Sequence, residues 1–205
     1  DWPARNVIGV LPGNGPQADQ VIVVGAHYDH LGIREGQIYN GADDNASGSA
    51  GVIEVCGALA QFPIRNRTLL CMTFTGEEIG LLGSEHYVQH PTVPITSIVA
   101  MLNMDMIGRW TPNVEANELA IQGLGTGDSF PRIIQRRADQ AGIHFLPDQS
   151  SKGPSDHASF NDADVPSLFF FTGVHADYHQ PGDDVEKRCR VLSGGEKARL
   201  LLALM

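Results

Sequence analysis

Short apolar runs alternate with helical patterns along most of the chain. Runs rich in Val, Ile, Leu and Phe, each bounded by Gly, Pro or polar residues, predict buried strands at 19–26, 68–74, 97–104 and 166–171. Apolar residues with helical spacing predict helices at about 44–62, 81–90, 128–141 and 194–205. This alternation indicates an α/β fold with a mostly parallel mixed central sheet and helices on both faces.

Length and composition limit the class of protein. The 205 residues, 42% of them hydrophobic, fit one domain covering residues 1–205. No apolar run reaches the roughly 18–20 residues that span a bilayer, so we expect no membrane association. The formal charge of −10 opposes binding to phosphate backbones, so a nucleic-acid partner is not expected either.

The three cysteines are too few and too widely spaced for a disulfide scaffold or a structural zinc site. Cys56 lies in a helical pattern and Cys71 in a strand pattern, which predicts that both are buried apolar residues. A Cys56–Cys71 bridge stays open as an alternative. The chain begins at Asp1 without a leader pattern, which leaves open that a leader has been removed.

Acids and histidines follow the predicted strands where each strand ends. They are His27 and Asp29, Glu77 and Glu78, Asp105, and His179, while Asp44 lies on the loop that enters the first long helix. Loops at the carboxyl ends of parallel strands meet at one edge of an α/β sheet, where ligands bind. These side chains are therefore expected to converge on one cleft.

So many carboxylates in one cleft would repel one another unless cations neutralise them. A set of candidate ligands made of imidazoles and carboxylates, without thiolates, favours a catalytic zinc site, with Co²⁺ or Mn²⁺ as possible substitutes for zinc. Two neighbouring ions need one shared carboxylate and about two more ligands each, and five residues supply that set: His27, Asp44, Glu78, Asp105 and His179. Asp29, two residues after His27, can orient the imidazole, and one acid of the Glu77-Glu78 pair can accept a proton from water.

Six motifs in the order of one family extend over residues 25 to 184. They are GAHYDHLG (25–32), GADDNASG (41–48), FTGEEIGLLGS (74–84), NMDMIG (103–108), GPSDHASF (153–160) and DYHQPGDD (177–184). Together they resemble the di-zinc exopeptidases, which include bacterial leucyl aminopeptidases, glutamate carboxypeptidase and the glutaminyl cyclases. The resemblance implies the zinc exopeptidase fold and hydrolysis of the N-terminal peptide bond of peptides with a free N-terminus.

The resemblance also implies a role for each matching residue. His27 and Asp105 would bind the first zinc, Glu78 and His179 the second, and Asp44, rather than Asp43, would bridge the two. Glu77 would be the general base for a water bridging the ions, and Tyr178 would stabilise the oxyanion. The remaining acids would support the ligands without binding metal, namely Asp29, Asp156 and Asp183. Because the family is commonly secreted or periplasmic, we expect the same here.

Three alternatives stay open. A glutaminyl cyclase-like acyltransferase would use one zinc, and a carboxypeptidase would need a basic pocket, for which Arg109 is the nearest candidate. A binding module on an inactive peptidase scaffold would have lost ligands, whereas all five are present here. The sequence leaves the side-chain preference and the oligomeric state open.

Two further features are assigned structural roles. Leu192–Glu196 (LSGGE) resembles the signature loop of ABC-type ATPases, but the chain has no GxxxxGK[ST] segment, so a C-terminal helix is expected. The other histidines are assigned to the surface or to packing, with His157 at most supporting the site: His30, His86, His90, His144, His157 and His175.

Overall fold

A mixed sheet lies at the centre of the computed structural model, which describes residues 3–109 and 118–185. Within these residues the sheet has seven strands, in the spatial order β1 (Val7–Leu11), β5 (Thr68–Phe74), β2 (Val21–His27), β6 (Ile98–Met104), β9 (Ser167–Phe171), β7 (Glu118–Gln122) and β8 (His144–Pro147). The four strands β5, β2, β6 and β9 are mutually parallel, whereas β1 and β7 run antiparallel to β5 and β9. The predicted α/β class with a mostly parallel mixed sheet is confirmed.

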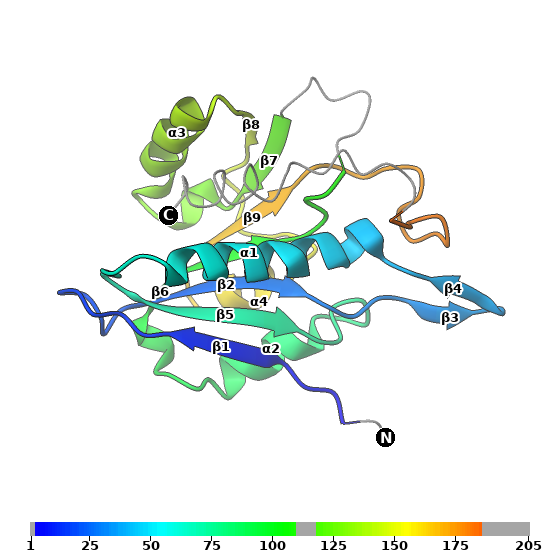
Figure 1. Cartoon of the computed structure of the whole chain (residues 1–205), viewed down its shortest axis with the longest axis horizontal. Coiled ribbons are helices and arrows are strands. Elements are labelled where there is room, and N and C mark those ends of the chain that lie inside the picture. The colour runs from blue at the N-terminus through cyan, green and yellow to red at the C-terminus, as the bar shows by residue number, and fades with distance from the viewer. Residues whose placement is uncertain (1–2, 110–117, 186–205) are drawn as a thin grey trace.

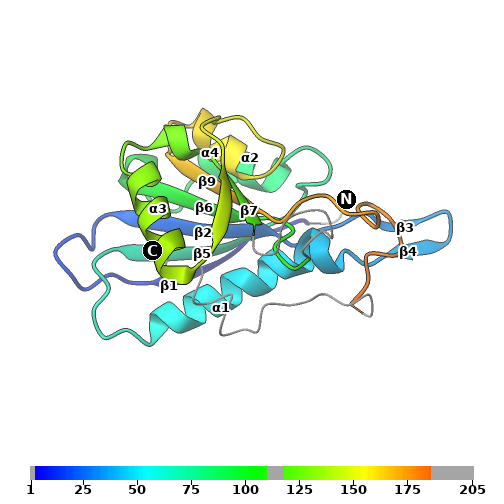
Figure 2. The same ribbon diagram turned by 90° about the horizontal axis from the view of Figure 1, so that it is seen from above.

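Helices cover both faces of the sheet (Figures 1 and 2). On one face, α1 (Gly48–Ala60) and α3 (Phe130–Ala141) place Val52, Val55 and Ile134 in an apolar cluster with alternate residues of the strands. On the other face, Tyr87 of α2 (Leu82–Gln89) and Phe160 of α4 (His157–Asp162) pack in a second cluster. No helix in the described part of the chain is long and apolar enough to cross a membrane.

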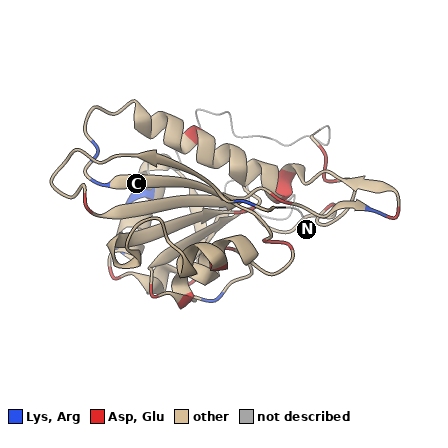
Figure 3. Ribbon diagram, turned by 90° about the horizontal axis from the view of Figure 1, so that it is seen from below, with Lys and Arg blue, Asp and Glu red and all other residues tan. Residues whose placement is uncertain are grey.

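A small hairpin, β3 (Gly32–Arg34) and β4 (Gln37–Tyr39), projects from one end of the sheet. Figure 3 shows the acidic turn that precedes α1 at this same end. That turn is the segment Ala42–Ser47, in which the backbone of Asp44 and Asn45 is not helical, and two short 3₁₀ turns lie at Ile95–Ser97 and Leu124–Thr126.

The predicted elements match the observed ones with shifts at their ends. The strand predicted at 68–74 has the same bounds in β5, and the helix predicted at 44–62 begins at Gly48, after the Ala42–Ser47 segment. Within that segment, the Oδ1 of Asn45 accepts the N–H of Gly48, the first residue of α1, at 2.9 Å. The prediction missed the short or half-exposed elements β1, β3, β4, β7, β8 and α4. The predicted C-terminal helix and the LSGGE segment lie outside the described residues.

Cys56 and Cys71 form a disulfide between α1 and β5. The prediction that both cysteines serve only as buried apolar residues was therefore wrong, and the alternative left open from the sequence is the one observed. Both sulfurs still lie beside the apolar cluster under α1. The bridge fixes the helix that follows the acidic turn onto the central strands.

Candidate metal centre

The carboxyl ends of the four parallel strands bring the candidate ligands together. His27 is the last residue of β2, Asp105 directly follows β6, Glu77 and Glu78 follow β5, and His179 lies on the loop after β9. Asp44 reaches the same place from the turn before α1. All five predicted ligands therefore lie at one end of the sheet, as the order of the motifs implied.

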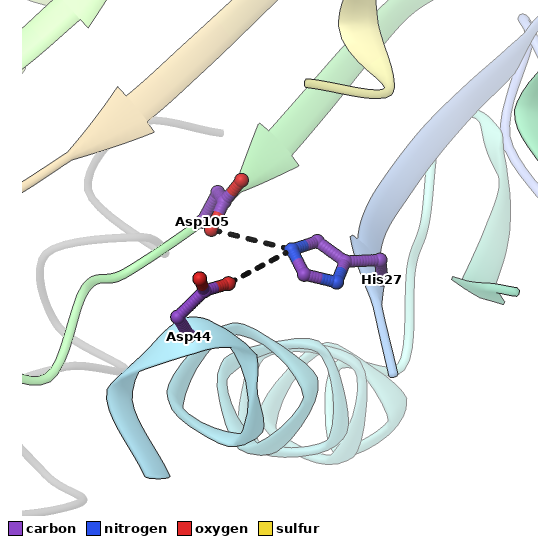
Figure 4. Close-up of side chains that lie close together, drawn as sticks. All are labelled: His27, Asp44 and Asp105. Atoms are coloured by element: carbon purple, nitrogen blue, oxygen red, sulfur yellow. Dashed lines mark ion pairs between the residues drawn. The ribbon is translucent and has the colours of Figure 1, made fainter. Parts of the chain in front are cut away.

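The His27 imidazole lies between two carboxylates (Figure 4). Its Nε2 is 3.3 Å from Oδ1 of Asp44 and 3.4 Å from Oδ1 of Asp105, and the side chain is 1% exposed. Its Nδ1 is 3.1 Å from the carbonyl oxygen of Asp29, which can only accept, so Nδ1 carries a proton. The ring is thus held with Nε2 directed at the two acids.

Asp44 presents its two oxygens to two different imidazoles. Oδ1 faces Nε2 of His27 at 3.3 Å, whereas Oδ2 lies 3.1 Å from Nε2 of His179. The same His179 nitrogen is 3.1 Å from Oε2 of Glu78. One carboxylate therefore lies between two groups of side chains, His27 with Asp105 and His179 with Glu78.

The spacing and the unpaired polar atoms of these residues suit the binding of a divalent metal ion. Ligand atoms about 2.0–2.2 Å from a tetrahedral zinc are roughly 3.3–3.6 Å apart, which matches the separations of 3.3 and 3.4 Å around His27 and slightly exceeds those of 3.1 Å around His179. Several buried polar atoms have no hydrogen-bond partner among the described residues, including His27 Nε2 and Asp105 Oδ1. Burial alone would lower the pKa of His27, but Asp105 and Asp44 outweigh it and raise this pKa to about 12. The arrangement calls for positive charge at this point.

Asp29 supports the site in a way that the sequence did not predict. Its carboxylate lies 3.9 Å from Nδ1 of His27, so its main-chain carbonyl rather than its side chain accepts the imidazole proton. The carboxylate instead accepts the backbone N–H groups of Glu77 at 3.2 Å and Glu78 at 3.3 Å. Asp29 therefore holds the turn that presents both glutamates.

Glu77 lies on the side of the His27 imidazole, with Oε2 3.9 Å from Nε2. Its side chain is largely buried, and burial together with the charges of Asp105 and Asp156 raises the pKa of Glu77 to about 8, against the lowering effect of His27. Glu77 and Glu78 thus differ in surroundings, because Glu78 faces His179 and Glu77 faces His27.

His30 belongs to the site, contrary to its predicted surface or packing role. Its Nδ1 lies 2.7 Å from Oε1 of Glu78, and its side chain is 8% exposed. Burial alone would raise the pKa of Glu78, but the His30 and His179 imidazoles lower it. In the described part of the chain, His30 with Asp44 and Glu78 forms a second group able to hold a metal ion, beside His27 with Asp44 and Asp105. The signal in the sequence was the position of His30 three residues after His27.

Tyr178 lies beside the second group of ligands. Its ring stacks on the imidazole of His179 with a centroid distance of 3.8 Å, and the residue is partly exposed. Burial and the carboxylates of Asp44 and Glu78 raise the pKa of its phenol to about 12. The hydroxyl group therefore keeps its proton at neutral pH and can donate a hydrogen bond.

Asp183, Asp43 and Asp156 are fully buried acids around the ligands. Asp183 accepts the backbone N–H groups of Asp43 and Asp44, which fixes the turn that carries Asp44. Asp43 accepts the Gly108 N–H at 2.7 Å through Oδ1, and its Oδ2 lies 3.3 Å from Nε2 of His175. Burial raises the pKa of Asp156 to about 7, and its charge acts on Glu77.

Arg109 and His175 are engaged with acids. Nη1 of Arg109 lies 2.6 Å from Oδ2 of Asp177 and Nη2 lies 3.3 Å from Oδ1 of Asp183. His175, predicted at the surface or in packing, is a buried partner of Asp43, with Nε2 3.3 Å from Oδ2. A guanidinium committed in this way is poorly placed to bind a substrate carboxylate.

Known proteins resemble this chain over most of its length. Aminopeptidase YwaD of Bacillus subtilis is 30% identical over 191 residues, which cover 89% of this chain and 40% of that protein. A probable leucine aminopeptidase of Trichophyton verrucosum is 30% identical over 201 residues, covering 91% of this chain and 53% of the relative. The crystal structure of a zinc aminopeptidase from Bacillus subtilis superposes with a TM-score of 0.79 at 28% identity, over 97% of this chain and 48% of that one.

The chain therefore spans about half of the length of these relatives, or somewhat less. The profile of Peptidase family M28 matches residues 6–203, nearly the whole sequence. Together with the shared fold and the converging acids and histidines, this match shows that the chain belongs to Peptidase family M28.

Proposed function

We propose that this chain is the catalytic region of a zinc aminopeptidase that hydrolyses the N-terminal peptide bond of peptides. The observation that carries the proposal is the position of Asp44, whose two oxygens face His27 and His179 separately. That arrangement supports two ions that share one carboxylate. It disfavours the single-zinc cyclase alternative, and the named aminopeptidases among the relatives support peptide hydrolysis.

The proposed ligands divide into two sets around Asp44. His27 and Asp105 would hold one zinc ion, and Glu78 and His179 the other, with Co²⁺ or Mn²⁺ as substitutes. When bound, such ions polarise a carbonyl group and lower the pKa of water to near neutrality. The Asp29 carboxylate would keep Glu78 in place through the backbone of the Glu77-Glu78 turn.

Glu77 would act as the general base. Its raised pKa of about 8 leaves it able to exchange a proton near neutral pH, and its carboxylate lies beside His27 rather than between the second pair of ligands. Glu77 would take a proton from the attacking water and pass it to the leaving amine. The protonated hydroxyl of Tyr178 would donate a hydrogen bond to the oxyanion that develops on the scissile carbonyl.

The contacts of Arg109 bear on which end of a peptide the site would bind. A carboxypeptidase needs a cation for the substrate carboxylate. Arg109, the candidate for that cation, is paired with Asp177 and Asp183. This pairing favours the aminopeptidase over the carboxypeptidase alternative.

The test replaces the proposed base and keeps the ligands. We expect Glu77→Gln to lower kcat for an aminoacyl anilide by about 10²–10⁴-fold while zinc content stays at the wild-type value. Glu85→Gln, an exposed acid on α2, is the matched control and should behave as wild type. Wild-type turnover in Glu77→Gln, or faster cleavage of peptides with an acetylated N-terminus than of free ones, would refute the proposal.

We also propose that the protein is secreted or periplasmic. The Cys56–Cys71 disulfide supports this, because such bridges persist mainly in oxidising compartments. Fractionation of cells that make the full-length natural protein should recover it from the medium or the periplasm. Recovery from the cytosol with both thiols free would contradict the assignment.

A further inference from the structure

A buried charged cluster lies behind the candidate ligands and takes no part in the chemistry proposed above. Nη1 of Arg109 contacts Asp177 Oδ2 at 2.6 Å and His175 Nδ1 at 3.1 Å, and Nη2 contacts Asp183 Oδ1 at 3.3 Å. The arginine side chain is 12% exposed and Asp183 is fully buried. We name this set the Arg109 cluster, consisting of Asp43, Arg109, His175, Asp177 and Asp183.

The Arg109 cluster joins three segments that carry metal-ligand candidates. Asp183 accepts the N–H groups of Asp43 and Asp44 on the turn before α1. Asp43 in turn accepts the Gly108 N–H on the segment after Asp105. The loop after β9, drawn in orange, lies beside the turn before α1 in both Figures 1 and 2. A single set of charges therefore connects the supports of Asp44, Asp105 and His179.

In the described part of the chain, few backbone hydrogen bonds join the loop after β9 to other segments. Within the loop, the backbone hydrogen bonds are local, such as Tyr178 N–H to His175 and Gln180 N–H to Asp177. Among the described residues, one backbone hydrogen bond, from Ala42 N–H to the Asp183 carbonyl at 3.2 Å, joins residues 173–185 to the rest of the chain. His179 itself has a φ of 53°, a left-handed conformation that is unfavourable for a residue with a Cβ. External contacts must therefore keep the imidazole where it is.

Arg109 is suited to that task because it supplies the fixed positive charge of the cluster. Three carboxylates lie within it: those of Asp43 and Asp183 are fully buried, and that of Asp177 is 22% exposed. Without the guanidinium these carboxylates would repel one another, and water would screen the two buried acids poorly. Outward movement of the loop would relieve this repulsion, and it would carry Tyr178 and His179 away from Asp44 and Glu78.

We propose that Arg109 is a positioning residue for the second metal ion, acting through Asp177 and Asp183 to hold His179 opposite Asp44 and Glu78. The inference rests on the proposed two-metal function and adds a residue that contacts neither ion. Residues that orient ligands typically contribute 10–100-fold to metal affinity. We therefore expect Arg109→Met to raise the zinc Kd of the second site by about that factor.

The experiment measures zinc binding with a chromophoric chelator as competitor, one site at a time. In a His27→Ala background, which disables the first site, Arg109→Met should weaken binding about 10–100-fold and Arg109→Lys should restore part of the loss. In a His179→Ala background, which removes a proposed ligand of the second site, Arg109→Met should weaken binding less than in the His27→Ala background, because Asp183 and Asp43 still accept the backbone N–H groups next to Asp44 and Asp105. Arg136→Met on α3, an exposed arginine, is the matched control.

Each outcome has a distinct meaning. Equal weakening in both backgrounds would show a general structural role and overturn the proposal, as would an unchanged Kd in the His27→Ala background. If Arg109→Met does not fold, Asp177→Asn tests the same link with the guanidinium retained, and it should weaken the second site alone. Failure of the otherwise unaltered protein to bind a second zinc ion would refute the proposed function itself, independently of any Arg109 variant.

Discussion

Removal of the Cys56–Cys71 disulfide has a stability cost that can be worked out from the structure. The bridge closes a loop of 15 residues between α1 and β5. Loop-closure entropy for about 15 residues corresponds to about 3 kcal/mol of stabilisation at 25 °C. For a chain of 205 residues, 1 kcal/mol shifts Tm by roughly 2–4 °C, so loss of the bridge should lower Tm by roughly 6–12 °C.

Thermal unfolding followed by circular dichroism measures this difference. The comparison is between the oxidised protein, the protein treated with a phosphine reductant, and the Cys56→Ala/Cys71→Ala double variant, all at one fixed zinc concentration. Reductant should lower the Tm of the wild type and leave the Tm of the double variant unchanged. The second result is the control, because it excludes an effect of the reductant on zinc or on Cys189.

Two outcomes would refute the reasoning. A wild-type Tm that reductant shifts by less than about 2 °C would mean that the bridge is absent or that the unfolded chain is not constrained by it. A double variant that still responds to reductant would place the sensitive group elsewhere. Either result would also remove the support that the disulfide gives to a secreted or periplasmic location.

Two further predictions concern buried histidines. Burial lowers the pKa of His157 to about 4, below the unfolded value of 6.5, so the folded state resists protonation of this imidazole. The contribution of His157 to folding stability is complete above pH 6.5 and falls by about 1.4 kcal/mol per pH unit as the pH drops toward 4. His157→Gln should flatten that slope in urea unfolding between pH 7 and 4, and an unchanged slope would contradict the assignment. His30→Ser removes the imidazole 2.7 Å from Glu78 and should weaken zinc binding about 10-fold, whereas His86→Ser on α2 should not; equal affinities would show that His30 is unnecessary.

The central strands and the place of the site could be predicted because they depend on local patterns. The apolar side chains of β5 are stable only when they are buried in the interior, so the sequence predicts the strand Thr68–Phe74 with the bounds that the structure has. The order of strand ends then placed His27, Asp105 and His179 at one edge before any contact was known. Elements such as β1, exposed at most of its positions, and α4, with six residues, are too short or too polar for a period to appear.

The contacts within the site could not be predicted, because they depend on the direction of individual groups. The sequence placed Asp29 beside His27 but could not show that its carbonyl would take the imidazole proton while its carboxylate holds the Glu77-Glu78 turn. It identified Arg109 and could not show that Asp177, far along the chain, would engage the guanidinium. Such pairings arise from tertiary packing and leave no periodic trace.

The position of Asp44 between two imidazoles is tested most directly by metal content. Plasma mass spectrometry of protein purified without chelators, with zinc at a modest excess, should find about two ions per chain, and Asp44→Asn should lose at least one of them. One ion per chain in the wild type, or two in Asp44→Asn, would contradict the account.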